Sequence, residues 1–360
     1  MQPVISITVQ ALEKRRRESA FSFRLARATV LTLVVVALAG CTSSPKLLKP
    51  EELVWPPAPE KPRIKFLRIL SDRKSIEGAG SKLLTALVGE GPNEALSKPY
   101  GVAVVHDGNV YVTETGEGRV FVFDTRNSKL SFLGSSPLGS VSLPLGIAVD
   151  SIGLVYISDG KLKCVLVYNR DGDLVESIGK PGDFQNPAGI AVDWPRRRLC
   201  IVDSHGHNVK VYTLSGKFLF AFGKRGTGDG EFNYPTNIAI GKDGRIYVVD
   251  TMNARVEVFD QDGNFLSKFG SLGDGLGQFT RPKGIALDSE GNIYVVDAAF
   301  NNFQIFNQKG ELLLFVGSLG TKPGMFWLPA GIAIDDQDRI FVVDQVNKRV
   351  QVFQLIKHAE

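Results

Sequence analysis

The sequence predicts an all-β protein, a six-bladed β-propeller with four-stranded antiparallel blades. The first observation is a motif, Pro-x-Gly-Ile-Ala-x-Asp or a close variant, that recurs six times at intervals of 45, 43, 48, 47 and 47 residues. The second is an acidic residue that recurs in phase with this motif. A four-stranded repeat of about 45 residues is typical of a propeller blade. The repeats start near Pro99, Pro144, Pro187, Pro235, Pro282 and Pro329, and the acidic residues are Glu114, Asp159, Asp203, Asp250, Asp297 and Asp344.

The fourth repeat shows why each unit should be a small antiparallel sheet. Runs of β-branched and aromatic residues predict strands at Asn237–Ile240, Arg245–Asp250, Arg255–Asp260 and Asn264–Phe269. Asp-Gly turns separate the first strand from the second and the third from the fourth, which favours hairpins. No window offers ten or more residues at helical period. Such a sheet cannot bury both faces alone, so repetition around a ring is expected.

The first forty residues are typical of a signal peptide. A basic cluster at Lys14–Arg17 precedes an apolar run, Ala28–Ala39, which is too short to span a bilayer. The run ends in Leu-Ala-Gly before Cys41, which resembles the bacterial lipoprotein box. The resemblance implies cleavage before Cys41, a diacylglyceryl group on its thiol and a palmitate-like acyl chain on its amine, which together anchor a protein stably. The alternative is an ordinary secretory signal followed by an incidental Cys.

Residue 42, which follows the anchored Cys, is Thr and not Asp, and the resemblance then implies the outer membrane of the cell envelope. We expect residues 41–62, with six prolines, to form an extended tether. The sequence has 42 basic and 38 acidic residues. Six of the basic and two of the acidic residues lie in residues 1–40, so residues 41–360 contain 36 basic and 36 acidic residues. A domain without net charge is a poor ligand for phosphate backbones, so nucleic acid is not an expected partner.

The ring, residues 63–360, is expected to close with strands from both ends of the chain. The sixth repeat ends after its third strand, Arg349–Leu355, and lacks a fourth. Arg63–Leu70 is an alternating segment without another assignment, and we expect it to supply the missing strand and remove an unpaired edge. Residues 76–96 form an insertion with a possible short helix at Lys82–Val88.

Across residues 99–355 the sequence resembles the NHL-repeat family, six-bladed propellers found in bacteria and animals. Together with the lipoprotein signal, the pattern resembles a group of bacterial six-bladed lipoproteins. The resemblance implies a fold more than a function. It rests on GIAVD (146–150, 189–193), GIALD (284–288), GIAID (331–335), YVVD (247–250, 294–297) and the Gly-x-Phe connectors that end at Phe232, Phe279 and Phe326.

Candidate binding residues lie where the repeats differ. In a propeller, the loops between second and third strands share one face with the connectors between blades, and variable loops on a repeated scaffold are common binding sites. The residue after each blade-opening Pro lies near the mouth of the central channel. From both sets we select Tyr100, Thr236, Lys283, His205, His207, Thr251, Met252, Phe300, Asn301 and Val346. The alternative is a solvated face without a ligand.

We expect a monomeric binding or scaffold module for a protein, a peptide or an envelope glycan. The alternative is an enzyme that uses the channel, a calcium-dependent lactonase-like hydrolase or a lyase. His205 and His207 could share a metal, but a site needs a third ligand. Asp203 lies nearby, but it occupies the repeated position at the end of a second strand, where we expect the acids to have a structural role. Calcium would need Asn237 with carboxylates that end first strands, namely Asp150, Asp193, Asp288 and Asp335. We therefore assign no catalytic residue, no metal ligand and no cofactor, and we expect Cys164 and Cys200 to be separate thiols.

Overall fold

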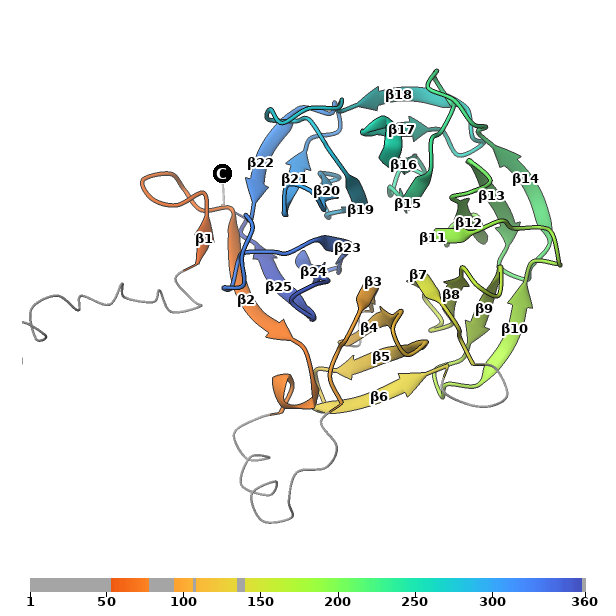
Figure 1. Ribbon diagram of the computed structural model, residues 1–360, viewed down its shortest axis with the longest axis horizontal. Coiled ribbons are helices and arrows are strands. Elements are labelled where there is room, and N and C mark those ends of the chain that lie inside the picture. Colours follow the sequence, from red (N-terminus) through yellow and green to blue (C-terminus); the bar gives the residue numbers. More distant parts are fainter. Residues whose placement is uncertain (1–52, 78–93, 106–107, 135–139, 358–360) are drawn as a thin grey trace, which may run out of the picture. The chain divides into compact units, whose positions relative to one another are not determined.

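The computed structural model describes residues 53–77, 94–105, 108–134 and 140–357, which lie in one compact unit, Lys49–Glu360. Six antiparallel sheets surround a central axis, and the first strand of each repeat is innermost (Figure 1). Cys41, the signal peptide and the helix expected at Lys82–Val88 lie outside the described residues. No helix in the described ranges is long and apolar enough to cross a membrane.

The prediction of a six-bladed propeller is confirmed, and in five of the blades four strands run from the axis outward in chain order. The first three blades are β3 (Pro99–Val104), β4 (Asn109–Glu114), β5 (Arg119–Asp124) and β6 (Lys129–Leu133); β7 (Pro144–Val149), β8 (Val155–Asp159), β9 (Cys164–Tyr168) and β10 (Leu174–Ile178); β11 (Pro187–Asp193), β12 (Arg198–Asp203), β13 (Asn208–Thr213) and β14 (Phe218–Phe222). The next two are β15 (Pro235–Ile240), β16 (Ile246–Asp250), β17 (Arg255–Phe259) and β18 (Phe265–Phe269); β19 (Pro282–Leu287), β20 (Ile293–Asp297), β21 (Asn302–Phe306) and β22 (Leu312–Val316).

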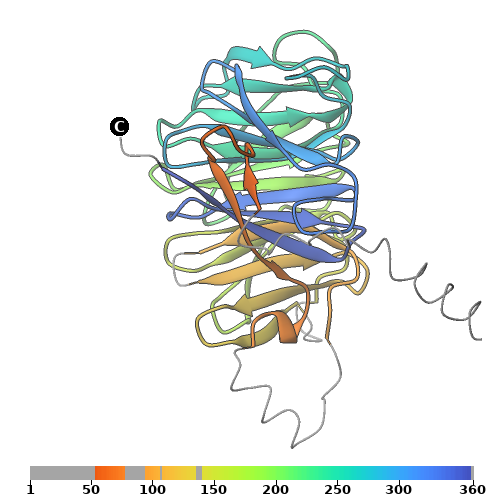
Figure 2. The same cartoon turned by 90° about the vertical axis from the view of Figure 1, so that its left-hand side faces the viewer.

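The sixth blade closes the ring as expected. It holds β23 (Pro329–Ile334), β24 (Arg339–Asp344) and β25 (Arg349–Leu355), and β2 (Ile64–Leu70) pairs with β25 along its length. The structure adds a strand that the sequence analysis placed in the extended tether. This is β1 (Val54–Trp55), which pairs with β2, and Figure 2 shows both strands beside the sixth blade. The Trp55 ring meets Phe353 edge-on, with centroids 5.7 Å apart.

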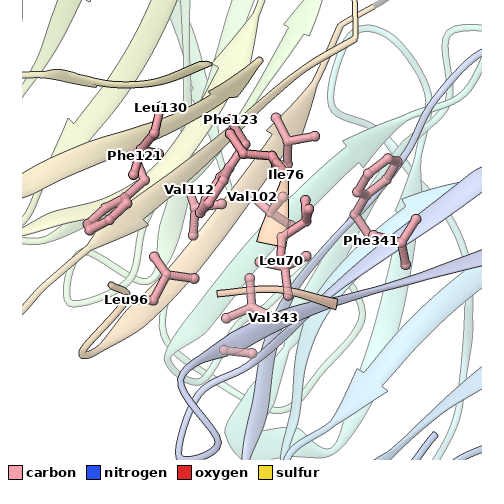
Figure 3. Close-up of a cluster of buried hydrophobic side chains, with 14 residues drawn as sticks. Leu70, Ile76, Leu96, Val102, Val112, Phe121, Phe123, Leu130, Phe341 and Val343 are labelled. Carbon is pink, nitrogen blue, oxygen red and sulfur yellow. The ribbon is translucent and has the colours of Figure 1, made fainter. Parts of the chain in front are cut away.

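The hydrophobic core is divided into six clusters of buried side chains, each between two neighbouring blades. Second and third strands are buried on both faces, whereas fourth strands such as β18 are largely exposed. The cluster between the sixth and first blades combines Leu70 of β2 with Phe341 and Val343 of β24 and Phe121 of β5 (Figure 3). Apolar burial therefore holds the blades to one another as well as each sheet together.

Candidate functional site

The loop face is the side of the ring that carries the loops between second and third strands and the connectors between blades. Its loops are Thr115–Gly118, Gly160–Leu162, Ser204–Asn208, Thr251–Ala254, Ala298–Asn302 and Gln345–Lys348. A short 3-10 helix, η3 (Thr251–Asn253), lies in the fourth of them. The residue directly before each third strand has a left-handed backbone, for example His207 (φ 53°) and Asn301 (φ 56°). The loops thus turn in the same way although their side chains differ.

The acidic residue at the end of each second strand is buried and fixes the neighbouring connector. Asp250 accepts from the Asn233 amide at 2.6 Å and from Arg255 Nε at 3.0 Å. Burial raises the pKa of Asp250, and these donors oppose that shift. In the sixth blade, Asp344 accepts from the Trp327 amide at 2.8 Å and from Arg349 Nε at 2.7 Å. The structural role expected for these acids is confirmed.

Three of the predicted site residues are bonded into the scaffold. Thr251 Oγ1 donates to the Pro282 carbonyl at 2.8 Å and lies 2.7 Å from Thr236 Oγ1, so it links two blades. His207 Nδ1 accepts from the Tyr234 amide at 3.2 Å. Asn301 Oδ1 likewise accepts from a connector amide 27 residues later, that of Leu328, at 2.9 Å. All three side chains are buried, so they support the loop face from below and contribute little to its exposed surface.

The remaining loop residues lie closer to solvent. Met252 is 62% exposed and Val346 is 39% exposed, while Phe300 is half-buried. The ring of His205 packs edge-on against Tyr234, with centroids 5.6 Å apart.

The structure reveals exposed apolar side chains in the connectors that the sequence analysis did not select, because its candidates came only from the loops and from the residues after the blade-opening prolines. They lie in the connectors before the fourth, fifth and sixth blades, and we group them with the exposed loop residues Met252 and Val346. We call the set the apolar sector: Tyr234, Met252, Leu272, Leu276, Leu319, Trp327, Leu328 and Val346.

The inner strands of the six blades line a central channel with a cavity of about 260 Å³. Tyr100, Thr236 and Lys283 line it, as the sequence predicted, whereas Ala188 is buried and does not. Lys283 Nζ lies 5.3 Å from the centre of the Tyr100 ring. Burial, reinforced by the nearby charge of Arg281, lowers the pKa of Lys283 to about 8. Burial raises the pKa of Tyr100.

Metal ligands are not brought together in the described part of the chain, where no group of three or more His, Cys, Asp or Glu side chains could hold an ion. The carboxylates considered for calcium end the first strands, at the face opposite the loop face. Asp150 and Asp288 accept from the amides of their own turns, and Asp193 pairs with Arg196 and Arg198. Cys164 and Cys200 are both free thiols.

Comparison with known proteins identifies the repeats. Residues 184–212 and 326–353 match the family model of the NHL repeat, and residues 241–304 match a family described as a 6-bladed beta-propeller. Two of the six repeats of this chain match the NHL repeat. Each matched NHL repeat runs from a buried connector Phe, Phe184 or Phe326, through the acid that fixes the connector, into the third strand. The repeat thus includes the elements that build the loop face.

Curated relatives share only part of their length with this chain. NHL repeat-containing protein 3 of Mus musculus is 32% identical over 94 residues, which are 23% of this chain and 27% of that protein. Protein brain tumor of Drosophila melanogaster is 30% identical over 59 residues, 16% of this chain and 6% of that protein. This chain therefore matches only a fraction of the length of each of these relatives.

Solved structures share the fold at low identity. A streptogramin B lyase superposes with a TM-score of 0.55 at 13% identity and covers 72% of this chain and 94% of its own. A gluconolactonase from Xanthomonas campestris gives a TM-score of 0.57 at 16% identity, over 82% of this chain and 99% of its own. At these identities the likeness shows the propeller architecture alone.

Proposed function

We propose that this protein is a lipid-anchored binding or scaffold module of the cell envelope that recognises a protein or peptide with its loop face. NHL propellers commonly mediate protein binding. The observation that carries the proposal is the apolar sector, because exposed apolar side chains gathered on one face of a soluble fold mark interaction sites. Leu276 and Leu272 are 76% and 73% exposed, and Met252 is 62% exposed.

The apolar sector is supported by a rigid scaffold. The guanidinium of Arg255 donates to the carbonyls of Thr227, Gly228 and Glu231 in the connector before the fourth blade. Arg349 holds the connector before the sixth blade through the same kind of bonds. A preorganised surface loses little conformational entropy on binding, which favours affinity.

Charged substitutions in the apolar sector should abolish partner binding. We expect Met252→Asp, Leu276→Asp and Trp327→Asp, combined in one protein, to lose a partner that the parent recovers by affinity capture from crosslinked cells. Ile152→Asp is the matched control, because Ile152 is 58% exposed in a turn on the opposite face. Equal recovery with the triple variant would exclude the loop face. Hydrolysis of small lactones by the parent would instead favour the channel enzyme.

The lipid anchor can be tested at Cys41, which lies outside the described residues. We expect Cys41→Ser to leave the protein unlipidated and to move it from the membrane fraction to the soluble fraction, because one missing thiol removes the site of acylation. Cys164→Ser is the control, since that thiol lies within the propeller. Full membrane association of the Cys41 variant would contradict the anchor and the outer-membrane location inferred with it.

A further inference from the structure

The channel contains a cation that no anion balances. Lys283 projects from β19 and lines the cavity, and among the described residues its ammonium group forms no ion pair and no hydrogen bond. It lies over the ring of Tyr100, two blades further round. The blade between them has only Ala330 at this position, which leaves the space that Lys283 crosses.

The surroundings of Lys283 make this charge unfavourable. The charged residue that contributes to the lowered pKa of Lys283 is Arg281, which has the same sign. None of the residues lining the cavity is Asp or Glu. With a pKa of about 8, Lys283 is still mostly protonated at neutral pH. A half-buried charge without an anionic partner is unfavourable for a fold, and a bound anion would relieve that cost.

Two other polar side chains in the cavity, those of Asn237 and Tyr100, offer hydrogen-bond donors, whereas the hydroxyl of Thr236 is already bonded to the Lys283 carbonyl and to Thr251. Asn237 Oδ1 accepts from the Ile238 amide at 2.8 Å, which leaves the Nδ2 group of Asn237 as a donor. The hydroxyl of Tyr100 has no protein partner among the described residues. An ammonium group, an amide NH₂ and a phenol O–H together match a group that only accepts hydrogen bonds.

We propose that the channel beside Lys283 binds a carboxylate group, with the ammonium of Lys283 as its counter-charge and the side chains of Tyr100 and Asn237 as donors. A single negative charge matches the single ammonium in the cavity. The lining is otherwise backbone and small aliphatic side chains, including Ala330 and Gly331, which suits the short apolar stem of a carboxylate. The carboxylate belongs either to a free small acid or to an acidic side chain of a bound peptide, and the second case rests on the proposed function.

The test uses the full-length protein with sodium propionate as the free carboxylate, against sodium chloride at equal ionic strength. Propionate should raise the Tm of the parent and of Lys161→Met, a control lysine exposed on the loop face. It should not raise the Tm of Lys283→Met, which should itself melt higher than the parent in chloride. Tyr100→Phe should weaken propionate binding several-fold. Affinity for propionate should fall about tenfold per pH unit above pH 8, as Lys283 loses its proton.

A second arm separates the two sources of the carboxylate with a capped peptide that carries a single Asp and its Asn counterpart. Tighter binding of the Asp peptide than of propionate, lost with Asn and with Lys283→Met, assigns the site to a peptide side chain. Propionate binding without peptide binding assigns it to a free acid. Failure of both ligands to bind the parent, or equal responses in Lys283→Met, would overturn the inference. Partner capture through the apolar sector would survive that failure, so the two proposals fail separately.

Discussion

A protein truncated to begin at Ser71 should melt roughly 10 °C or more below one that begins at Arg63. The two differ only by residues 63–70, which include β2. This strand buries Ile64, Phe66 and Leu70 almost completely, and Phe66 packs against Phe353 with ring centroids 5.6 Å apart. Each such side chain contributes about 1.5–3 kcal/mol when buried. Their sum is a large part of the 5–15 kcal/mol that stabilises a typical domain.

The loss of β2 also exposes the edge of β25 and opens two interblade clusters, because Phe66 and Leu70 belong to different clusters. A milder variant, Phe66→Ala, should lower the free energy of unfolding by about 3–5 kcal/mol with the strand still present. Differential scanning calorimetry on the two truncated proteins and this variant measures the effect. Equal melting temperatures for the two truncations would show that β2 does not stabilise the ring.

Glu257→Gln should stabilise the protein at pH 8 by up to roughly 3 kcal/mol and remove part of its pH dependence. Glu257 in β17 and Gln351 in β25 occupy the same position of their blades. Gln351 accepts from the Gly324 amide at 2.8 Å and donates to the Met325 carbonyl at 2.6 Å. Glu257 accepts from the Gly230 amide at 3.2 Å but has no proton to donate when ionised.

The charge balance explains why the carboxylate of Glu257 is unfavourable. Burial raises the pKa of Glu257 to about 7, with Arg255 opposing the shift and Asp250 and Asp229 adding to it. Arg255 Nη2 lies 2.8 Å from Glu257 Oε1, but the same guanidinium already pairs with Asp250. Two carboxylates therefore share one cation. In the sixth blade, Arg349 serves Asp344 alone.

A folded-state pKa above the unfolded value means that protonation of Glu257 stabilises the fold. This stability is fully present below about pH 4.5, the ordinary value, and is lost as the pH rises to about 7. Urea unfolding of the parent and of Glu257→Gln at pH 5 and pH 8 should show curves that diverge at the higher pH. The reciprocal change, Gln351→Glu, should destabilise the protein more at pH 8 than at pH 5. Parallel curves for parent and variant would contradict this account.

Much of the fold could be predicted because the same pattern of strands and turns recurs six times in the sequence. The last repeat lacks a fourth strand, and the segment Arg63–Leu70 had no other assignment. Together these two observations predicted that the segment supplies the missing strand. β1 was not predictable in the same way, since Val54 and Trp55 stand alone among prolines and carry no period. Their strand exists because β2 offers an edge and Phe353 a ring for Trp55, both of which depend on the closed blade.

The candidate site was predictable as a face but less so as side chains. The order of strands decides which loops share the loop face. Whether Thr251, His207 or Asn301 is free depends on connector atoms that come 27 to 31 residues later, and no local pattern records those bonds. Lys283 was identified as a channel residue, but its lack of an anionic partner depends on what the five other blades place around it.

The pairing of β2 with β25 also has a consequence for biosynthesis. Ile64 pairs with Leu355, which lies in the last strand of the ring. During synthesis β2 is therefore made early and stays without its partner β25 until residues up to Leu355 have been added. Contacts of such long sequence separation form slowly. A chain cut short before Arg349 would keep an open edge and the apolar side chains of Ile64 and Phe66 in solvent, features that promote aggregation and proteolysis. The ring can therefore close only after β25 has been synthesised.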